Sequence, residues 1–233
     1  MTFLDITNFL LIQAQAPVSD VTTQEFSFWK IMFHGNIFAN IVMITVLCLG
    51  IFSLYIFLER LFYINRQLKV NDINMMNNIN DLLKEGKLQS AIDYCERQNT
   101  PEARILEKGI TRIGRPVSDI VSAMESQGQI EVSLLEKNMN LLASIPSIAP
   151  MLGLLGTVIG IIMAFFNMAN MEGSFSPKTL SEGIYTALGQ TATGLAVAIP
   201  SNFFYNLLLT RIDKFILKVQ NLSSDFLDII NKP

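Results

Sequence analysis

The sequence has little that could perform bond chemistry. Its 233 residues include one histidine, His34, and two cysteines, Cys48 and Cys95. A single histidine excludes a multi-histidine metal site and a histidine-based triad within one chain, and two cysteines exclude a disulfide framework. The sequence also has no HExxH, no CxxC and no glycine-rich phosphate loop ahead of a helix. The composition therefore does not favour an enzyme, and it predicts no cofactor or metal.

Charge is scarce and unevenly spread. Charged residues make up 16% of the chain, the net charge is −3 and hydrophobic residues make up 50%. Without a concentrated Lys/Arg patch, this balance does not favour nucleic acid as a partner. No charged residue occurs from Asn138 to Met171 or from Gly183 to Thr210. Because about 20 mostly apolar residues suffice to cross a bilayer, we expect an integral membrane protein.

Three apolar runs fit membrane-crossing helices, and the charges around them predict an orientation. Arg60 and Arg66 follow the first run, whereas only Lys30 precedes it, so the positive-inside rule places the amino terminus outside and the carboxyl terminus in the cytoplasm. The first span is apolar nearly all round and is expected to face lipid. The predicted organisation is a periplasmic tail and interfacial helix 1–35, spans 36–58, 141–169 and 183–209, a cytoplasmic helical region 59–140, a periplasmic loop 170–182 and a cytoplasmic carboxyl-terminal helix 210–233.

The first 35 residues carry two weaker signals. Residues 1–16 end in Ala-Gln-Ala like a signal peptide, but no positive charge comes first, and Asp5 and Asn8 interrupt the apolar part. We therefore expect an uncleaved tail. Trp29 lies just ahead of the first span, where a short interfacial helix is expected.

The region between the first two spans contains a series of helix signals. MMNNINDLLKEG predicts a helix closed by Gly86, LQSAIDYCERQ predicts a second, and Thr100 before a proline is a good N-cap for a third, PEARILEKGITRI. From Ser118 a long amphipathic helix is expected to run without a break into the second span. Its charged residues are expected on solvated helix faces, with some subunit contacts and no catalytic carboxylate pair.

The second and third spans are rich in small residues. Glycine costs about 1 kcal/mol in a helix relative to alanine, so its repeated use favours close approach of two helices. In the third span an adjoining strip of mainly small residues includes Thr191 and Gly194. The residues expected to pack the helices together are Gly153, Gly156, Gly160 and Gly194.

Polar side chains lie deep in the same two spans. Thr157 is in the second, and Thr186, Gln190 and Thr193 recur at i, i+4 and i+7 of the third, within a narrow arc of a helix. One such threonine is more often bonded back to its own helix. The cluster instead indicates a path for water or protons, although helix packing alone stays an alternative. Because the two spans contain no Asp, Glu or His, a proton-binding group would have to come from another polypeptide.

The stretches APMLGLLGTVIGIIMAF and GIYTALGQTATGLAVAIPSNFFYN resemble the two pore helices of the MotA/TolQ/ExbB proton-channel family. The similarity extends to the whole layout, and three spans with the amino terminus outside are closer to ExbB or TolQ than to the four-span MotA. The resemblance implies an all-α polytopic membrane protein with long helices reaching a small cytoplasmic helical domain. It also implies a homopentamer in the bacterial inner membrane.

The resemblance further implies a partner and a function. The pore would enclose an ExbD-like single-span protein with a membrane aspartate, and the complex would energise a TonB-like protein with the proton gradient. Thr157 and Thr191 would border that aspartate. Thr186, Gln190 and Thr193 are expected in the same proton pathway on the strength of their spacing alone. One departure is Thr186, which stands where the family often has glutamate. Rival interpretations are a TolQ-like role in envelope integrity, a non-conducting scaffold and, least favoured by the span count, a motility stator.

Overall fold

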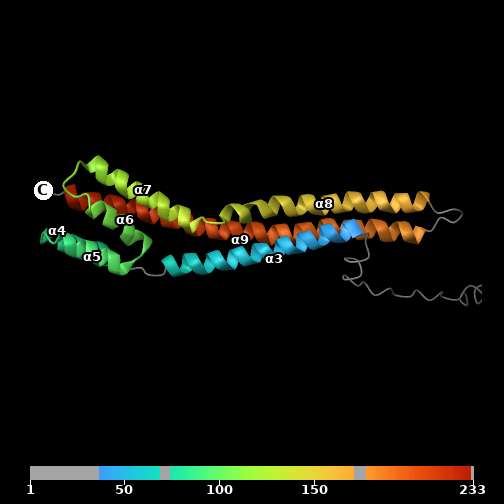
Figure 1. Ribbon diagram of the computed structural model, residues 1–233, viewed down its shortest axis with the longest axis horizontal. Helices are drawn as coiled ribbons and strands as arrows, with labels where there is room; N and C mark the ends of the chain where they lie inside the picture. Colours follow the sequence, from blue (N-terminus) through green and yellow to red (C-terminus); the bar gives the residue numbers. More distant parts are fainter. Residues whose placement is uncertain (1–36, 69–73, 171–176, 232–233) are drawn as a thin grey trace, which may run out of the picture.

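The computed structural model describes residues 37–68, 74–170 and 177–231, and within these ranges every regular element is a helix. Helix α3 corresponds to the first apolar run, α4 to α7 to the region between the spans, and α8 and α9 to the second and third spans (Figure 1). The helices are α3 Ile37–Leu68, α4 Met75–Lys84, α5 Leu88–Gln98, α6 Pro101–Ile110, α7 Val117–Leu135, α8 Met139–Ala169 and α9 Pro177–Asn231.

Three of these helices are long and apolar enough to cross a membrane, as the sequence predicts. They are α3, α8 and α9, and they lie side by side along one half of an elongated molecule (Figure 1). The 55-residue α9 is continuous, so a single helix runs from the apolar half to the opposite end of the molecule. The prediction that this helix reaches about Ile229 is confirmed, because it ends at Asn231.

Helix α3 has one buried and one exposed side. Buried residues recur every three or four positions, and large apolar side chains such as Ile51 (71% exposed) and Tyr55 (62%) cover the opposite side. The buried side packs on α8 and α9, and the opposite side is exposed among the described residues. The buried residues of α3 are Ala39, Met43, Val46, Ser53, Ile56, Arg60 and Ile64.

Helices α4 to α7 gather at the opposite end of the molecule with the last part of α9 (Figure 1); we call them the α4–α7 module. Gly86, with φ of +68°, follows α4, and the Thr100 hydroxyl accepts a hydrogen bond from the Ala103 backbone at the start of α6. Both termini were predicted and are confirmed. Met124 of α7 and Phe226 of α9 meet over Gly109 of α6, where a side chain would not fit. The module therefore has an apolar core shared with α9.

The expectation of one unbroken helix from residue 118 into the second span is wrong. Helix α7 ends at Leu135 and α8 begins at Met139. Between them Asn138 adopts φ of +63°, a left-handed conformation that asparagine tolerates better than most residues. Arg60 of α3 lies against this elbow and donates to the carbonyl of Leu134, one of the α7 carbonyls left without a helical partner. Amphipathic periodicity alone did not reveal the break.

Several expectations fall outside the described residues. They are the amino-terminal tail with its processing, the interfacial helix, and most of the loop between the second and third spans.

Candidate functional site

Helices α8 and α9 approach each other unusually closely. A Cβ on Gly153 would lie 2.9 Å from the Gln190 carbonyl oxygen, and one on Gly160 would lie 2.8 Å from the Cβ of Ala187. From the other side, a Cβ on Gly194 would lie 2.7 Å from the Ala149 carbonyl oxygen. Real Cβ atoms are not found at such distances, so these positions require glycine.

The close approach brings the two threonines of the candidate site into contact. Thr157 of α8 and Thr191 of α9 are hydrogen-bonded through their hydroxyls. The Thr157 hydroxyl also lies 3.1 Å from the Gly153 carbonyl and 3.2 Å from the Ala187 carbonyl, and the Thr191 hydroxyl lies 3.3 Å from the Gly153 carbonyl. Thr157 is buried and Thr191 is partly exposed. Thr191 is therefore the member of the pair that a neighbouring molecule can reach.

The two hydroxyls of the pair have more acceptors than protons. Each threonine donates one hydrogen and accepts others, so Thr157 and Thr191 cannot satisfy every neighbouring carbonyl at once. Either threonine can donate to the other while its partner donates to a carbonyl. Such a pair can reverse its direction, which is what passing a proton along hydroxyls requires. It cannot hold a net charge, since neither group titrates near neutral pH.

Gln190 lies at the junction of α3, α8 and α9. Its side chain is 3% exposed, its amide nitrogen donates to the Ala39 carbonyl of α3 across 3.3 Å, and a Cβ on Gly156 would collide with it. The amide oxygen has no hydrogen-bond partner. Gln190 therefore ties the first span to the hairpin.

The other two threonines of the predicted arc are bonded to their own helix. Thr193 is 7% exposed and donates to the Gly189 carbonyl, while Thr186 donates to the Glu182 carbonyl. Of the predicted polar residues, the structure joins Thr157 and Thr191 directly. It places Gln190 against α3. A pore-lining role for any of the five stays a prediction.

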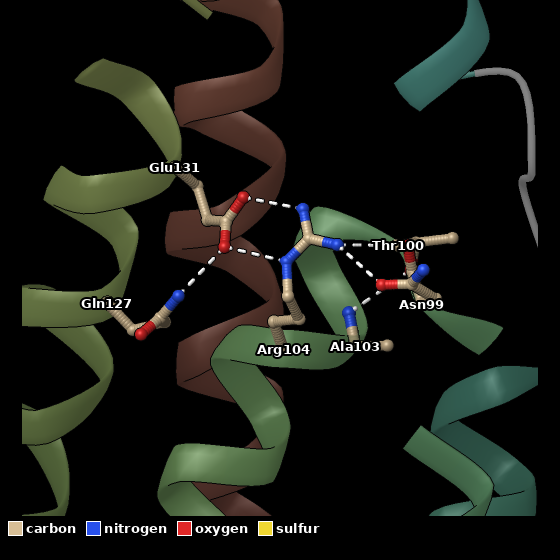
Figure 2. Close-up of polar contacts among 6 residues, drawn as sticks. All are labelled: Asn99, Thr100, Ala103, Arg104, Gln127 and Glu131. Carbon is tan, nitrogen blue, oxygen red and sulfur yellow. Dashed lines mark hydrogen bonds and ion pairs between the residues drawn. The ribbon is translucent and has the colours of Figure 1, made fainter. Parts of the chain in front are cut away.

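Sequence reasoning missed a set of buried charges in the α4–α7 module (Figure 2). Glu131 of α7 is 2% exposed, and its two oxygens accept bonds of 2.8 and 2.7 Å from Arg104 of α6. Gln127 donates to the same carboxylate, and Arg104 also donates to Asn99. The hydrogen bonds to Glu131 raise the pKa of Arg104 above its ordinary value. These groups join α6 to α7 through an ion pair.

A second buried acid joins α6 to α9. Glu102 is 2% exposed and accepts a 3.0 Å bond from Lys218. The expectation that charged residues of this region lie on solvated helix faces is wrong for Glu102 and Glu131, because both are buried. A signal was present for Glu131, because it continues the buried series Ile120, Met124 and Gly128 of α7 at helical spacing. An acid within an apolar series indicates a buried partner of opposite charge.

Cys95 is a free, buried cysteine of α5. Burial, with the nearby Glu107 charge, raises the pKa of the Cys95 thiol to about 12, which keeps it protonated and unreactive at neutral pH. Within the described ranges, no group of three His, Cys, Asp or Glu side chains is placed to hold a metal.

A family model described as the MotA/TolQ/ExbB proton channel family matches residues 97–221. A putative biopolymer transport protein ExbB homolog of Methanothermobacter thermautotrophicus is 29% identical over 78% of this chain and 64% of its own length. The biopolymer transport protein ExbB of Helicobacter pylori is 48% identical over 34% of this chain and 54% of its own length. The chain thus spans less than two thirds of these two relatives. The Tol-Pal system protein TolQ of Haemophilus influenzae is 25% identical over 90% of this chain and 96% of its own length.

Proposed function

The chain belongs to the MotA/TolQ/ExbB proton channel family, and we propose that it is an ExbB-like subunit that couples the proton-motive force to TonB-dependent transport. The observation that carries the proposal is the direct contact of Thr157 and Thr191 across a tightly packed hairpin. Glycines on both helices hold this contact in place. In a membrane, such hydroxyls mark a path for a polar species or join helices.

The titrating group of this path is supplied by another chain. From residue 138 to 171 and from 183 to 210 there is no carboxylate or imidazole. We propose that an ExbD-like single-span helix places its membrane aspartate beside Thr191, the partly exposed member of the pair. Moving one charge through the membrane field releases about 2.3 kcal/mol per 100 mV. That energy would drive the movement passed to a TonB-like protein.

The assembly and orientation follow from the same proposal. Five copies would surround the partner helices in the bacterial inner membrane, with α3 on the lipid side. The amino terminus would be periplasmic, and the α4–α7 module would lie in the cytoplasm with the end of α9. Arg60 and Arg66 at the end of α3 support this orientation by the positive-inside rule.

Replacing the hydroxyls tests the proposal. We expect Thr157→Val or Thr191→Val to abolish proton flux into liposomes that contain the purified complex, while assembly with the partner survives. Thr157→Ser keeps the hydroxyl and should retain most of the flux. Thr45→Val is a matched control, because Thr45 is an exposed threonine of α3 that bonds to the Ile41 carbonyl of its own helix. Undiminished flux in both valine variants of the pair would contradict the proposal.

The long alignment with TolQ favours a second candidate, a TolQ-like role in envelope integrity and cell division. Deletion of the gene separates the two. Loss of siderophore or haem uptake supports the ExbB-like role, whereas leakage of the outer membrane supports the TolQ-like one. A scaffold without conduction would show no flux in liposomes even with the partner present, and mutation of the partner's aspartate would change nothing.

A further inference from the structure

Helix α9 presents three sides within its charge-free stretch. One side packs on α8 through positions such as Gly194. A second packs on α3, where a Cβ on Gly50 would lie 3.1 Å from Val197 and the rings of Phe204 and Phe57 stack at 4.2 Å. The third side is covered by neither helix. Leu188, Leu195 and Ile199 on this side are 58%, 46% and 69% exposed.

Toward the α4–α7 module the third side gains exposed polar residues beside the exposed Phe203. After Ile199 it continues with Asn202, Asn206 and Thr210, all exposed. From Leu188 to Thr210 these positions lie within an arc of about 80° on a helix of 3.6 residues per turn. The amide of Asn206 donates to the backbone and side-chain oxygens of Asn202, and Thr210 donates to the Asn206 carbonyl. The polar side chains thus form a ladder along one line of the helix.

Contact of this ladder with lipid acyl chains would be energetically unfavourable. An amide in hydrocarbon loses its bonds to water, and the bonds within the ladder leave acceptor positions on Asn202 and Asn206 unused. Asn202 lies eleven positions beyond Thr191, about 16 Å along the helix axis. The ladder is therefore on the same helix as the candidate site, at a separate level nearer to the charged end of α9.

We propose that Asn202, Asn206 and Thr210 line the water-filled cytoplasmic mouth of the proton path, and that Leu195 and Ile199 form a dry band between this mouth and the threonine pair. The inference rests on the proposed function, because it takes Thr191 as the point at which protons leave the partner. Apolar constrictions close channels by excluding water. The band would prevent free leakage, so that protons pass only when the partner moves.

Water access to the ladder can be measured without any transport activity. In the full chain with its partner, in inverted membrane vesicles, single cysteines replace Asn202, Asn206 or Ile199 in a Cys48→Ser background. Cys95 can stay, because its raised pKa and burial keep it unreactive. We expect a charged, membrane-impermeant maleimide to label Asn202→Cys and Asn206→Cys, and to label Ile199→Cys at least tenfold more slowly.

A depth-matched control separates a water-filled mouth from simple closeness to the membrane surface. The pairs Gly50–Val197 and Phe57–Phe204 have the same sequence separation, so α3 and α9 keep a constant register. That register places Tyr55, on the outward side of α3, at the depth of Asn202. Tyr55→Cys should stay unlabelled. Labelling of Asn202→Cys no faster than that of Tyr55→Cys would overturn the inference.

The dry band is tested by making it polar. Ile199→Asn should raise the passive proton leak of liposomes containing the complex several-fold. The equivalent change at Phe52, which the register places at the same depth on α3 and which is 44% exposed, should not. An unchanged leak in Ile199→Asn would overturn the band. If the unaltered complex passes no protons at all, the proposed function fails, and the labelling still decides whether the mouth holds water.

Discussion

The membrane-spanning helices and the α4–α7 module handle buried polarity differently. In the spans many hydroxyls, such as those of Thr193 and Ser201, bond to a carbonyl four residues back on their own helix. In the module, charged side chains bridge from one helix to another, as Arg104 does to Glu131. Bilayer hydrocarbon offers no water to hydrate the charges of a broken ion pair. Hydrogen bonds within one helix avoid that cost. A polar bond that crosses between spans, as at Thr157 and Thr191, is therefore more informative than one in the module.

Removing one member of the buried ion pair should have the largest effect on stability. Arg104→Met should lower the free energy of unfolding by about 3–5 kcal/mol, because it leaves the Glu131 carboxylate buried without its cation. Thermal unfolding of the detergent-purified protein, followed by circular dichroism, measures the loss. The double variant with Glu131→Leu should recover most of it. A double variant as unstable as the single one would show that packing, and not charge, accounts for the effect.

Crowding the hairpin should have the next largest effect. Gly194→Ala should cost about 1–3 kcal/mol, because the new Cβ would lie 2.7 Å from the Ala149 carbonyl oxygen, a backbone atom that cannot rotate away. Gly128→Ala is the control in the module, where the nearest side-chain atom would be 3.9 Å away. Alanine is the better helix former, so this variant should be neutral or more stable. Equal melting temperatures for the two variants would contradict the tight approach.

Bridging and locally bonded threonines can be compared directly. Thr157→Val should cost about 0.6 kcal/mol and at most about 1.7 kcal/mol, the range measured for hydrogen bonds between membrane helices. Thr193→Val removes a bond within one helix and should cost less. Unfolding of the helices in mixed micelles gives both values. A greater cost for Thr193→Val would indicate that the Thr157–Thr191 contact does little to join the helices.

The smallest effect is expected at the surface of the module. Lys87 and Glu85 form an exposed ion pair, and the hydrogen bond that Lys87 donates to Glu85 raises the pKa of Lys87. Exposed pairs contribute little because water and salt screen them. Lys87→Gln should leave the melting temperature unchanged at ordinary salt concentrations. A clear drop that disappears at high salt would contradict this and assign the pair a role in stability.

Local signals in the sequence located two helix boundaries in the α4–α7 module. Gly86 marks the end of α4 and Thr100 the start of α6, through conformations that these residue types favour. The elbow at Asn138 was missed, since asparagine is tolerated both inside helices and in left-handed turns. The burial of Glu102 and Glu131 was also missed, because their cations are supplied by distant parts of the chain.

The sequence by itself determined that three helices are long and apolar enough to cross a membrane, because run length and absence of charge decide whether a helix is stable in hydrocarbon. It also singled out the glycines and hydroxyls of the second and third spans. Only the tertiary structure decided which side of α9 meets which neighbour. It placed Thr191 against Thr157 and Gln190 against α3, and it left the Asn202 side uncovered by the other described helices. A helical period fixes the angles between side chains but not the rotation of the whole helix, which is set by where the partner helices pack.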